Sequence, residues 1–288
     1  FSAAERMFFT PRGLEQATDE IIAAYKQQRF AAGRAVADLC CGIGGDTLAI
    51  ASRGPVIGVD RDENVATLAA ANLLDASLHA STSAEIRCAD AVQFDVTAYS
   101  AWHIDPDRRP QGKRTTRVSL HEPNDAAIDS LRIRNPSGAI KLAPAAEVPP
   151  HWAVEAELEW VGHDRQCQQL VAWFGSLSNA TGQRRATVLH HGQAYSFSGT
   201  KSTRADVAKK IGRFVYEPHA AVLAADLWRD LAAQRGLAAV EANIPYLTAD
   251  DLLDVPILDD PMLARFEVVE VLPFDKKRLK AVLRARGA

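Results

Sequence analysis

Cysteine and long apolar runs are both scarce in this sequence. The 288 residues contain four cysteines, Cys40, Cys41, Cys88 and Cys167, and these form no pair of C-x-x-C motifs that could hold zinc. We therefore expect reduced thiols in a cytoplasmic protein, and no bound metal. No apolar run reaches the roughly 18 residues that a membrane-spanning helix needs, and no signal peptide is visible. These absences exclude a disulfide-stapled secreted domain, a zinc module and a membrane partner.

A strong net charge is missing as well. The chain has 33 Lys and Arg residues against 36 Asp and Glu, which gives a formal net charge of −3. Any contact with nucleic acid must therefore come from a local basic patch. The hydrophobic share of 47% and the charged share of 24% are ordinary for a globular protein, and the length suits one large domain with a small one. Because the chain begins at Phe1 rather than Met, we expect that an N-terminal piece is missing.

Short apolar runs alternate with helical patterns through the first half of the chain. We expect strands at 35–40, 55–60, 85–90, 101–106 and 138–144. Helices are expected at 14–30, 63–76 and 124–134, and one more after the glycines near residue 45, with Asp46 as its N-cap. This alternation predicts right-handed βαβ units and hence a doubly wound parallel sheet.

The pattern changes beyond residue 150. We expect strands at 154–162 and 184–191, a helix at 167–177, and an antiparallel pair among the last strands. The Gly-, Ser- and Thr-rich stretch 191–204 is typical of a turn or linker. After it come helical patterns, a strand-like run at 266–274 and a basic helix at 275–287, which indicate a small α+β domain. The predicted organisation is an N-terminal helical segment (1–30), a ligand-binding α/β domain (31–200) and a second domain (205–288).

Acidic residues follow the expected strands at one edge of the sheet. The stretch DLCCGIGGD, from Asp38 to Asp46, is a Gly-rich turn between a strand and a helix, where backbone N–H groups can approach a ligand. Such glycines can also serve a tight turn alone. Asp38, however, precedes the glycines, where a carboxylate suits a ligand ammonium better than a pyrophosphate. Asp60 ends the next strand, where it can accept hydrogen bonds from ribose hydroxyls, and Asp90 ends the third.

These motifs resemble a known family. DLCCGIGGD, VIGVDRDE, CAD and IDPD look like successive motifs of class I S-adenosylmethionine-dependent methyltransferases. FTPRGLEQAT, DPDRR, IKLAP, VYEP and the terminal FEVVEVLPFDKKRLK are similar to bacterial methyltransferases with a C-terminal THUMP-like domain, themselves similar to the trimethylguanosine synthase group. The resemblance implies a Rossmann-like, seven-stranded doubly wound sheet, S-adenosylmethionine as cofactor, and an RNA substrate. The cofactor-binding residues that it implies, with the strand-end acids, are Phe9, Thr10, Pro11, Asp38, Cys40, Gly42, Gly44, Gly45, Asp46, Asp60, Arg61, Asp90 and Ala91.

The loop HIDPDRR after the fourth strand is the candidate reactive loop. In amine-directed methyltransferases, an acid or amide before Pro accepts hydrogens from the target nitrogen, and the resemblance gives this role to Asp105 and the Pro106 carbonyl. The usual motif continues with a second Pro and an aromatic residue. Here Asp107 and Arg108 stand instead. Asp107 could accept a proton and a guanidinium can stack on a base, but a plain surface Asp–Arg pair is an open alternative.

Two clusters of basic residues are candidates for RNA contact. Arg108, Arg109, Lys113 and Arg114, with Arg117 close behind, crowd beside the reactive loop and could bind phosphates of tRNA or rRNA. A second run ends the chain, from Lys276 to Arg286. Both could instead be solvated helix or loop faces. We therefore predict an RNA base methyltransferase that favours an exocyclic amine of guanine or adenine, with a small-metabolite methyltransferase, a dinucleotide oxidoreductase and a non-catalytic cofactor-binding adaptor as alternatives.

Overall fold

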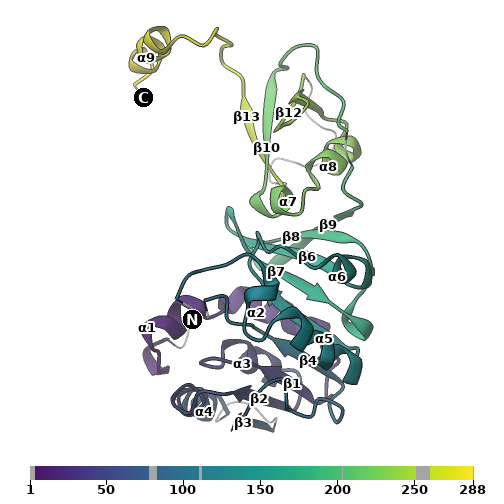
Figure 1. Ribbon diagram of the computed structural model, residues 1–288. Coiled ribbons are helices and arrows are strands. Elements are labelled where there is room, and N and C mark those ends of the chain that lie inside the picture. The colour runs from purple at the N-terminus through teal and green to yellow at the C-terminus, as the bar shows by residue number, and fades with distance from the viewer. Residues whose placement is uncertain (1–3, 78–82, 110–111, 203, 251–259, 288) are drawn as a thin grey trace.

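Two β-sheets organise the chain. The computed structural model describes residues 4–77, 83–109, 112–202, 204–250 and 260–287. Figure 1 shows a large sheet with helices packed around it, and a second sheet from the later part of the chain. The strands of the large sheet are β1 (Val36–Leu39), β2 (Val56–Asp60), β3 (Ala84–Cys88), β4 (Ala101–Ile104), β5 (Gly138–Leu142), β6 (Glu157–His163), β7 (Gln166–Trp173), β8 (Arg184–His190) and β9 (Gln193–Gly199).

The strand order shows a doubly wound sheet. It runs β3-β2-β1-β4-β5-β7-β6-β8-β9. The pairs from β3 to β5 are parallel, and β7 is antiparallel to both of its neighbours, β5 and β6. This confirms the predicted fold class. The predicted number of seven strands is wrong, because β7 and β9 lie where no strand was expected, which gives nine described strands. β8 joins β6 in parallel, and β9 pairs with β8 in an antiparallel hairpin.

Two segments of this sheet differ from the sequence-based expectation. β7 occupies most of the expected helix 167–177, because its run from Leu170 to Trp173 is buried on both faces. A short apolar run of this kind cannot be assigned to helix or strand by periodicity. β9 lies in the expected linker. Its hairpin turn has positive φ at both His191 (47°) and Gly192 (74°), the geometry of a two-residue turn between strands.

Helices lie on both faces of the large sheet. They are α1 (Pro11–Gln16), α2 (Glu20–Lys26), α3 (Gly45–Ala51), α4 (Glu63–Ser77), α5 (Asp125–Arg134) and α6 (Pro150–Glu155), with short 3₁₀ turns η1 (Ala4–Arg6), η2 (Gln27–Arg29), η3 (Val118–Leu120) and η4 (Gly175–Leu177). Alternate residues of strand β1 pack in two different hydrophobic cores, one on each face of the sheet. Val36 packs in one core with Ile22 of α2, whereas Ala37 packs in the other with Ile128 of α5. Strands covered on both faces must be apolar throughout, which explains the continuous runs in the sequence.

Two helix boundaries correct the sequence analysis. The expected helix 14–30 is divided between α1 and α2, and Asp19 caps α2 by accepting a hydrogen bond from the Ile21 amide at 2.8 Å. α3 begins at Gly45, with Gly44 as its N-cap at φ 89°, a backbone conformation that favours glycine. The predicted N-cap role of Asp46 is therefore wrong. Asp46 lies in the first turn, which leaves its side chain available for the pocket described below.

The later part of the chain forms a four-stranded antiparallel sheet in the order β11-β12-β10-β13. Its elements are β10 (Phe214–Pro218), α7 (Ala220–Ala224), α8 (Trp228–Arg235), β11 (Ala238–Glu241), β12 (Ile244–Ala249), β13 (Leu263–Glu267) and α9 (Lys276–Ala285). Apolar side chains of α7 and α8 share one core with β6 and β7 of the large sheet. The expected strand 266–274 is wrong beyond Glu267, and α9 projects away from both sheets without a buried residue (Figure 1). Within the described ranges, no helix combines the length and apolar character needed to cross a bilayer.

Candidate active site

A cavity of about 330 Å³ lies where β1, β2, β3 and β4 end. This volume is at the lower end of the range for small-molecule sites, about 300–1,000 Å³. The carboxyl edge of such a sheet is where doubly wound folds bind ligands. The lining residues that the sequence predicted are Thr10, Asp38, Cys40, Gly42, Gly45, Asp46, Asp60, Arg61, Asp90, Ala91, Asp105, Pro106, Asp107 and Arg108.

The loop between β1 and α3, residues 40–44, shapes one wall of this cavity, and we call it the glycine loop. Its first residue, Cys40, has φ 52°, a conformation that costs a non-glycine residue on the order of 1–3 kcal/mol and tends to occur at functional sites. The start of α1 packs closely on the loop, since a Cβ on Gly13 would lie 2.8 Å from Ile43 Cγ2. Asn72 of α4 ties the segment before α1 to the loop, because its Nδ2 donates to the carbonyls of Phe8 (3.1 Å) and Ile43 (3.0 Å). The N-terminal segment therefore forms part of the cavity wall.

Asp60 connects the glycine loop to β2. Its Oδ2 accepts a hydrogen bond from the Gly42 amide at 3.0 Å, and its Oδ1 accepts one from the Asp62 amide at 3.1 Å. Burial raises the pKa of Asp60, although these two amides oppose the shift. A carboxylate offers about four lone-pair positions, so Asp60 keeps capacity for two more donors. Asp90 caps the turn after β3 and accepts from the Val92 amide at 2.7 Å.

Asp38 is held by residues on two other elements. It is 1% exposed. Its Oδ2 accepts from the Thr47 hydroxyl at 2.5 Å, and its Oδ1 lies 2.7 Å from Nδ1 of His103 on β4. The sequence analysis assigned no role to His103, although a histidine inside a buried strand is a signal of a polar site. Since both oxygens of Asp38 already have a partner, any ligand donor must use their second lone pairs.

Asp46 belongs to a second buried pair that the sequence analysis did not find. Its Oδ1 lies 2.7 Å from Lys26 Nζ of α2, and its Oδ2 accepts from the Thr18 hydroxyl at 2.6 Å. Burial opposes ionisation of Asp46, but the charge of Lys26 and its hydrogen bond to the carboxylate outweigh this and lower the pKa of Asp46. Burial lowers the pKa of Lys26 despite this partner. The pair fixes the N-terminal helices against α3 beside the cavity.

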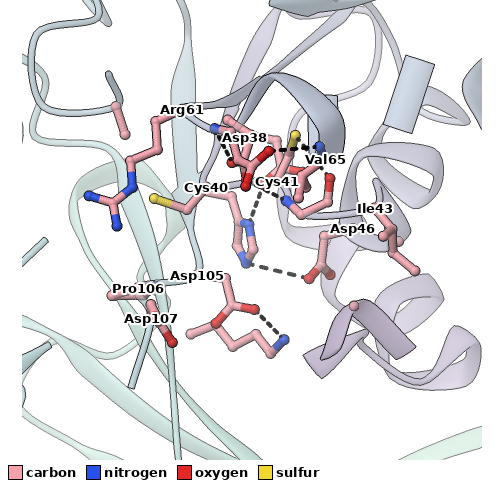
Figure 2. Close-up of a pocket in the computed structure, with 18 of the residues that line it drawn as sticks. Asp38, Cys40, Cys41, Ile43, Asp46, Arg61, Val65, Asp105, Pro106 and Asp107 are labelled. Atoms are coloured by element: carbon pink, nitrogen blue, oxygen red, sulfur yellow. Dashed lines mark hydrogen bonds and ion pairs between the residues drawn. The ribbon is translucent and has the colours of Figure 1, made fainter. Parts of the chain in front are cut away.

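Asp105, in the candidate reactive loop, also has a partner that was not predicted. Lys141 of β5 places Nζ 2.6 Å from Asp105 Oδ2, and both side chains line the cavity. Figure 2 shows Asp105 facing the cavity, on the side opposite to the glycine loop residues Cys40 and Cys41. Burial would lower the pKa of Lys141, but the carboxylates of Asp105 and Asp46 raise it. The ammonium of Lys141 therefore stays charged beside Asp105.

The remaining predicted residues lie outside the cavity lining. These are Phe9, Pro11, Gly44, Arg109, Lys113 and Arg114. Glu15 of α1 forms ion pairs with Arg109 (2.9 Å) and Arg114 (3.9 Å), and Glu147 lies 3.7 Å from Arg117. Much of the basic cluster beside the reactive loop is therefore already compensated by acids of the chain.

The Cys40 thiol has no nucleophilic character in this environment. It lines the cavity, but burial, together with the carboxylates of Asp60 and Asp105, raises its pKa far above the usual value. The thiolate is the reactive form of cysteine, so Cys40 contributes shape rather than covalent chemistry.

We predict that Asp60→Ala weakens S-adenosylmethionine binding roughly tenfold to a hundredfold, since hydrogen bonds to charged groups contribute about 1.5–3 kcal/mol. Isothermal titration calorimetry measures the change. Asp60→Asn, whose amide oxygen can still accept from Gly42, should bind with an affinity between those of the alanine variant and the wild type. Unchanged affinity of the alanine variant would rule out a ribose contact for Asp60.

Comparisons with known proteins agree with this site. No family model matches the chain. A Mycobacterium tuberculosis protein, described as an uncharacterized S-adenosylmethionine-dependent methyltransferase, is 29% identical over 280 residues, which are 96% of this chain and 74% of the relative. The same protein from a second strain gives the same values. The crystal structure of a proposed methyltransferase from Porphyromonas gingivalis W83 superposes with a TM-score of 0.79 at 20% identity and covers 96% of this chain and 71% of that chain.

The strand order, the acids at the strand ends and these relatives define one class of protein. They support the predicted class, the class I S-adenosylmethionine-dependent methyltransferases, and with it S-adenosylmethionine as the cofactor. The cavity fits that cofactor in its chemistry, because carboxylates suit both an ammonium group and ribose hydroxyls. The roles of the individual residues, the THUMP-like domain and the kinship with the trimethylguanosine synthase group stay predictions.

Proposed function

We propose that this methyltransferase transfers a methyl group to the exocyclic amine of an RNA base, guanine or adenine. The observation that carries the proposal is Asp105, whose carboxylate forms an ion pair with Lys141 at 2.6 Å in the same cavity as Asp38 and Asp60. An ionised carboxylate can only accept hydrogen bonds. The acceptor of the methyl group must therefore present N–H or O–H donors, as an amine does.

The chain's own residues do the work of positioning. Lys141 occupies Oδ2 of Asp105, which leaves Oδ1 and the Pro106 carbonyl to accept the two hydrogens of an amine. Held in this way, the nitrogen directs its lone pair into the cavity. S-adenosylmethionine, when bound, supplies an electrophilic methyl group on its sulfonium. Correct placement of two reacting groups can account for most of the barrier reduction in such a displacement.

The C-terminal helix supports RNA as the larger substrate. α9 begins with Asp275 as N-cap, whose Oδ1 accepts from the Arg278 amide at 2.7 Å. α9 lies away from the large sheet (Figure 1). The basic side chains of this segment are all exposed, and of these Arg286 pairs with Glu270 at 3.1 Å. These side chains are Lys276, Lys277, Arg278, Lys280 and Arg284, followed by Arg286. A dense group of exposed cations is the electrostatic pattern of a phosphate-binding surface.

A small-metabolite methyltransferase is the second candidate, and one observation favours it. Glu15 and Glu147 compensate three arginines near the cavity mouth, and acids outnumber bases among the residues that line the cavity. Such a surface attracts a neutral or cationic amine more readily than a polyanion. A non-catalytic adaptor remains the third candidate, because Asp107 and Arg108 replace the usual Pro and aromatic residue. We also propose a cytoplasmic location, which the four free cysteines support.

Transfer of a labelled methyl group separates these candidates. We would incubate the protein and labelled S-adenosylmethionine separately with the RNA fraction and with the small-molecule fraction of cells that lack the protein. Nucleosides from the RNA are then analysed by mass spectrometry. We expect label in an N-methylated purine of tRNA or rRNA, and loss of that nucleoside from the cells that lack the protein. Label in the small-molecule fraction would favour the second candidate, and no label in either fraction would favour the adaptor.

The role of α9 needs a variant that leaves the fold intact. Deleting residues 205–288 would expose the core that α7 shares with the large sheet, so we would instead replace Lys276, Lys277, Arg278 and Lys280 by Gln. We expect weaker RNA binding and a smaller dependence of affinity on salt, because fewer counterions are released. An unchanged salt dependence would contradict RNA binding by α9.

A further inference from the structure

Ionisable side chains from five helices and strands and from one loop meet at the inner end of the cavity. Asp38 and His103 are joined at 2.7 Å, Lys26 and Asp46 at 2.7 Å, and Lys141 and Asp105 at 2.6 Å. Lys26 Nζ also lies 3.4 Å from His103 Nε2, which links the first two pairs. Strand, helix and loop therefore contribute to one group of charges beside the proposed reaction centre, and we call these six residues the inner cluster.

The inner cluster carries one uncompensated negative charge. An ammonium can only donate hydrogen bonds, so the Lys26 contact assigns the acceptor role to His103 Nε2 and leaves the ring proton on Nδ1, toward Asp38. Three carboxylates then face two ammonium groups. Moving a proton between the members of any pair leaves this sum unchanged. The negative charge is therefore a property of the whole inner cluster, whichever partner holds each proton.

The inner cluster is largely buried, so water screens its negative charge only weakly. The side chains of Asp38 and Lys26 are 1% and 2% exposed, those of Asp46 and Lys141 are 10% and 12% exposed, and that of Asp105 is 28% exposed. Water screens such groups poorly. Of the other acids that line the cavity, Asp60 and Asp107 are half-buried, whereas Asp62, Asp90 and Glu122 are exposed. The fields of the exposed acids are screened, and Glu122 is paired with Arg61.

We propose that the inner cluster makes the cavity discriminate between the methyl donor and its demethylated product, and that Lys141 sets the degree of discrimination. This inference rests on the proposed function. In the transfer, the carbon–sulfur bond breaks with both electrons staying on sulfur, the nitrogen lone pair forms the new bond to carbon, and the nitrogen later releases a proton to water. The sulfonium thereby becomes a neutral thioether. The ligand loses one positive charge opposite a site with one negative charge to spare, which favours release of the product.

The ratio of two dissociation constants tests this proposal without a methyl acceptor. Calorimetry at pH 8 gives the Kd of S-adenosylhomocysteine divided by the Kd of S-adenosylmethionine. We would measure this ratio for the wild type, for Lys141→Met, for Asp105→Asn and for the double variant. Lys141→Met makes the inner cluster more negative and should raise the ratio roughly fivefold, and Asp105→Asn makes it neutral and should lower the ratio by a similar factor. The double variant restores the original charge and should return the ratio close to the wild-type value.

A matched control and a second variant keep the outcomes distinct. Asp164→Asn removes an acid that is 84% exposed and should leave the ratio unchanged. Lys141→Gln replaces the Met variant if the latter does not fold, as judged by circular dichroism. If the wild type binds neither ligand, the proposed function fails. If both ligands bind and all four ratios are equal, the proposed function stands and the discrimination by the inner cluster is wrong.

Discussion

Replacement of Asp105 by Asn should lower methyl transfer by on the order of 100-fold or more, the loss expected when a reacting group is misplaced by about 1 Å. The amide is nearly the same size and its oxygen can still accept from Lys141, so the fold should persist. It carries no charge, however, and its NH₂ group donates where the target amine also donates. Single-turnover transfer to the RNA fraction that accepts label, at saturating S-adenosylmethionine, measures the effect.

The same variant tests the division of roles within the cavity. Its affinity for S-adenosylmethionine should fall only about fivefold, as expected from the lost charge. Asp164→Asn serves as the control, since it removes an exposed acid at the turn between β6 and β7 and should transfer at the wild-type rate. A complete loss of cofactor binding in Asp105→Asn would show that Asp105 holds the cofactor rather than the target nitrogen.

The acids at the sheet edge could be predicted from sequence because their positions follow from topology. In a parallel sheet every carboxyl end lies at the same edge. An acid that ends an apolar run, as Asp38, Asp60 and Asp105 do, is therefore placed near the others before any distance is known. The glycines between the first strand and its helix locate that edge independently. This reasoning needs only the order of strands, which the alternating pattern supplied.

The partners of those acids could not be predicted in the same way. Lys26 occupies an ordinary polar position of a helix, and nothing in the local pattern connects it to Asp46. His103 and Lys141 carried a usable signal, because each places an ionisable side chain inside a strand that is otherwise apolar. Such a residue needs a buried partner. Which acid supplies that partner depends on strand pairing and side-chain direction, and sequence spacing contains neither.

The segments assigned wrongly share a physical cause as well. The run from Leu170 to Trp173 in β7 is apolar on both faces, so no period distinguishes it from a buried helix. β9 lies at the edge of the sheet with small and polar residues, which resemble a linker. The FEVVEVLPF run alternates like a strand, yet pairing with β10 ends at Glu267. In each case, neighbours in space decide the structure, and local composition does not.

The largest effect on stability is expected at a buried ion network far along the sheet from the cavity. Arg29 Nη1 lies 2.9 Å from Glu157 Oε2 and Nη2 lies 3.3 Å from Glu159 Oε2, and both glutamate side chains are 0% exposed. Arg29→Met leaves these carboxylates partly uncompensated in the core. Loss of one partner of a buried pair costs about 3–5 kcal/mol, so the free energy of unfolding should fall by this amount. Urea denaturation followed by circular dichroism measures it, with exposed Arg34→Met as a control that should change little.

The pH dependence of this loss identifies its cause. Burial opposes ionisation of Glu157, but hydrogen bonds from Arg29 and the Asn179 amide, with the charge of Arg185, lower its pKa below 4.5. A carboxyl group with a lowered folded pKa contributes stability above its unfolded pKa, and that stability is lost as pH falls through the folded pKa. The difference between wild type and Arg29→Met should therefore narrow in acid. A difference that stays constant with pH would instead assign the loss to packing, since the Arg29 guanidinium also lies 5.0 Å from the centre of the Trp173 ring.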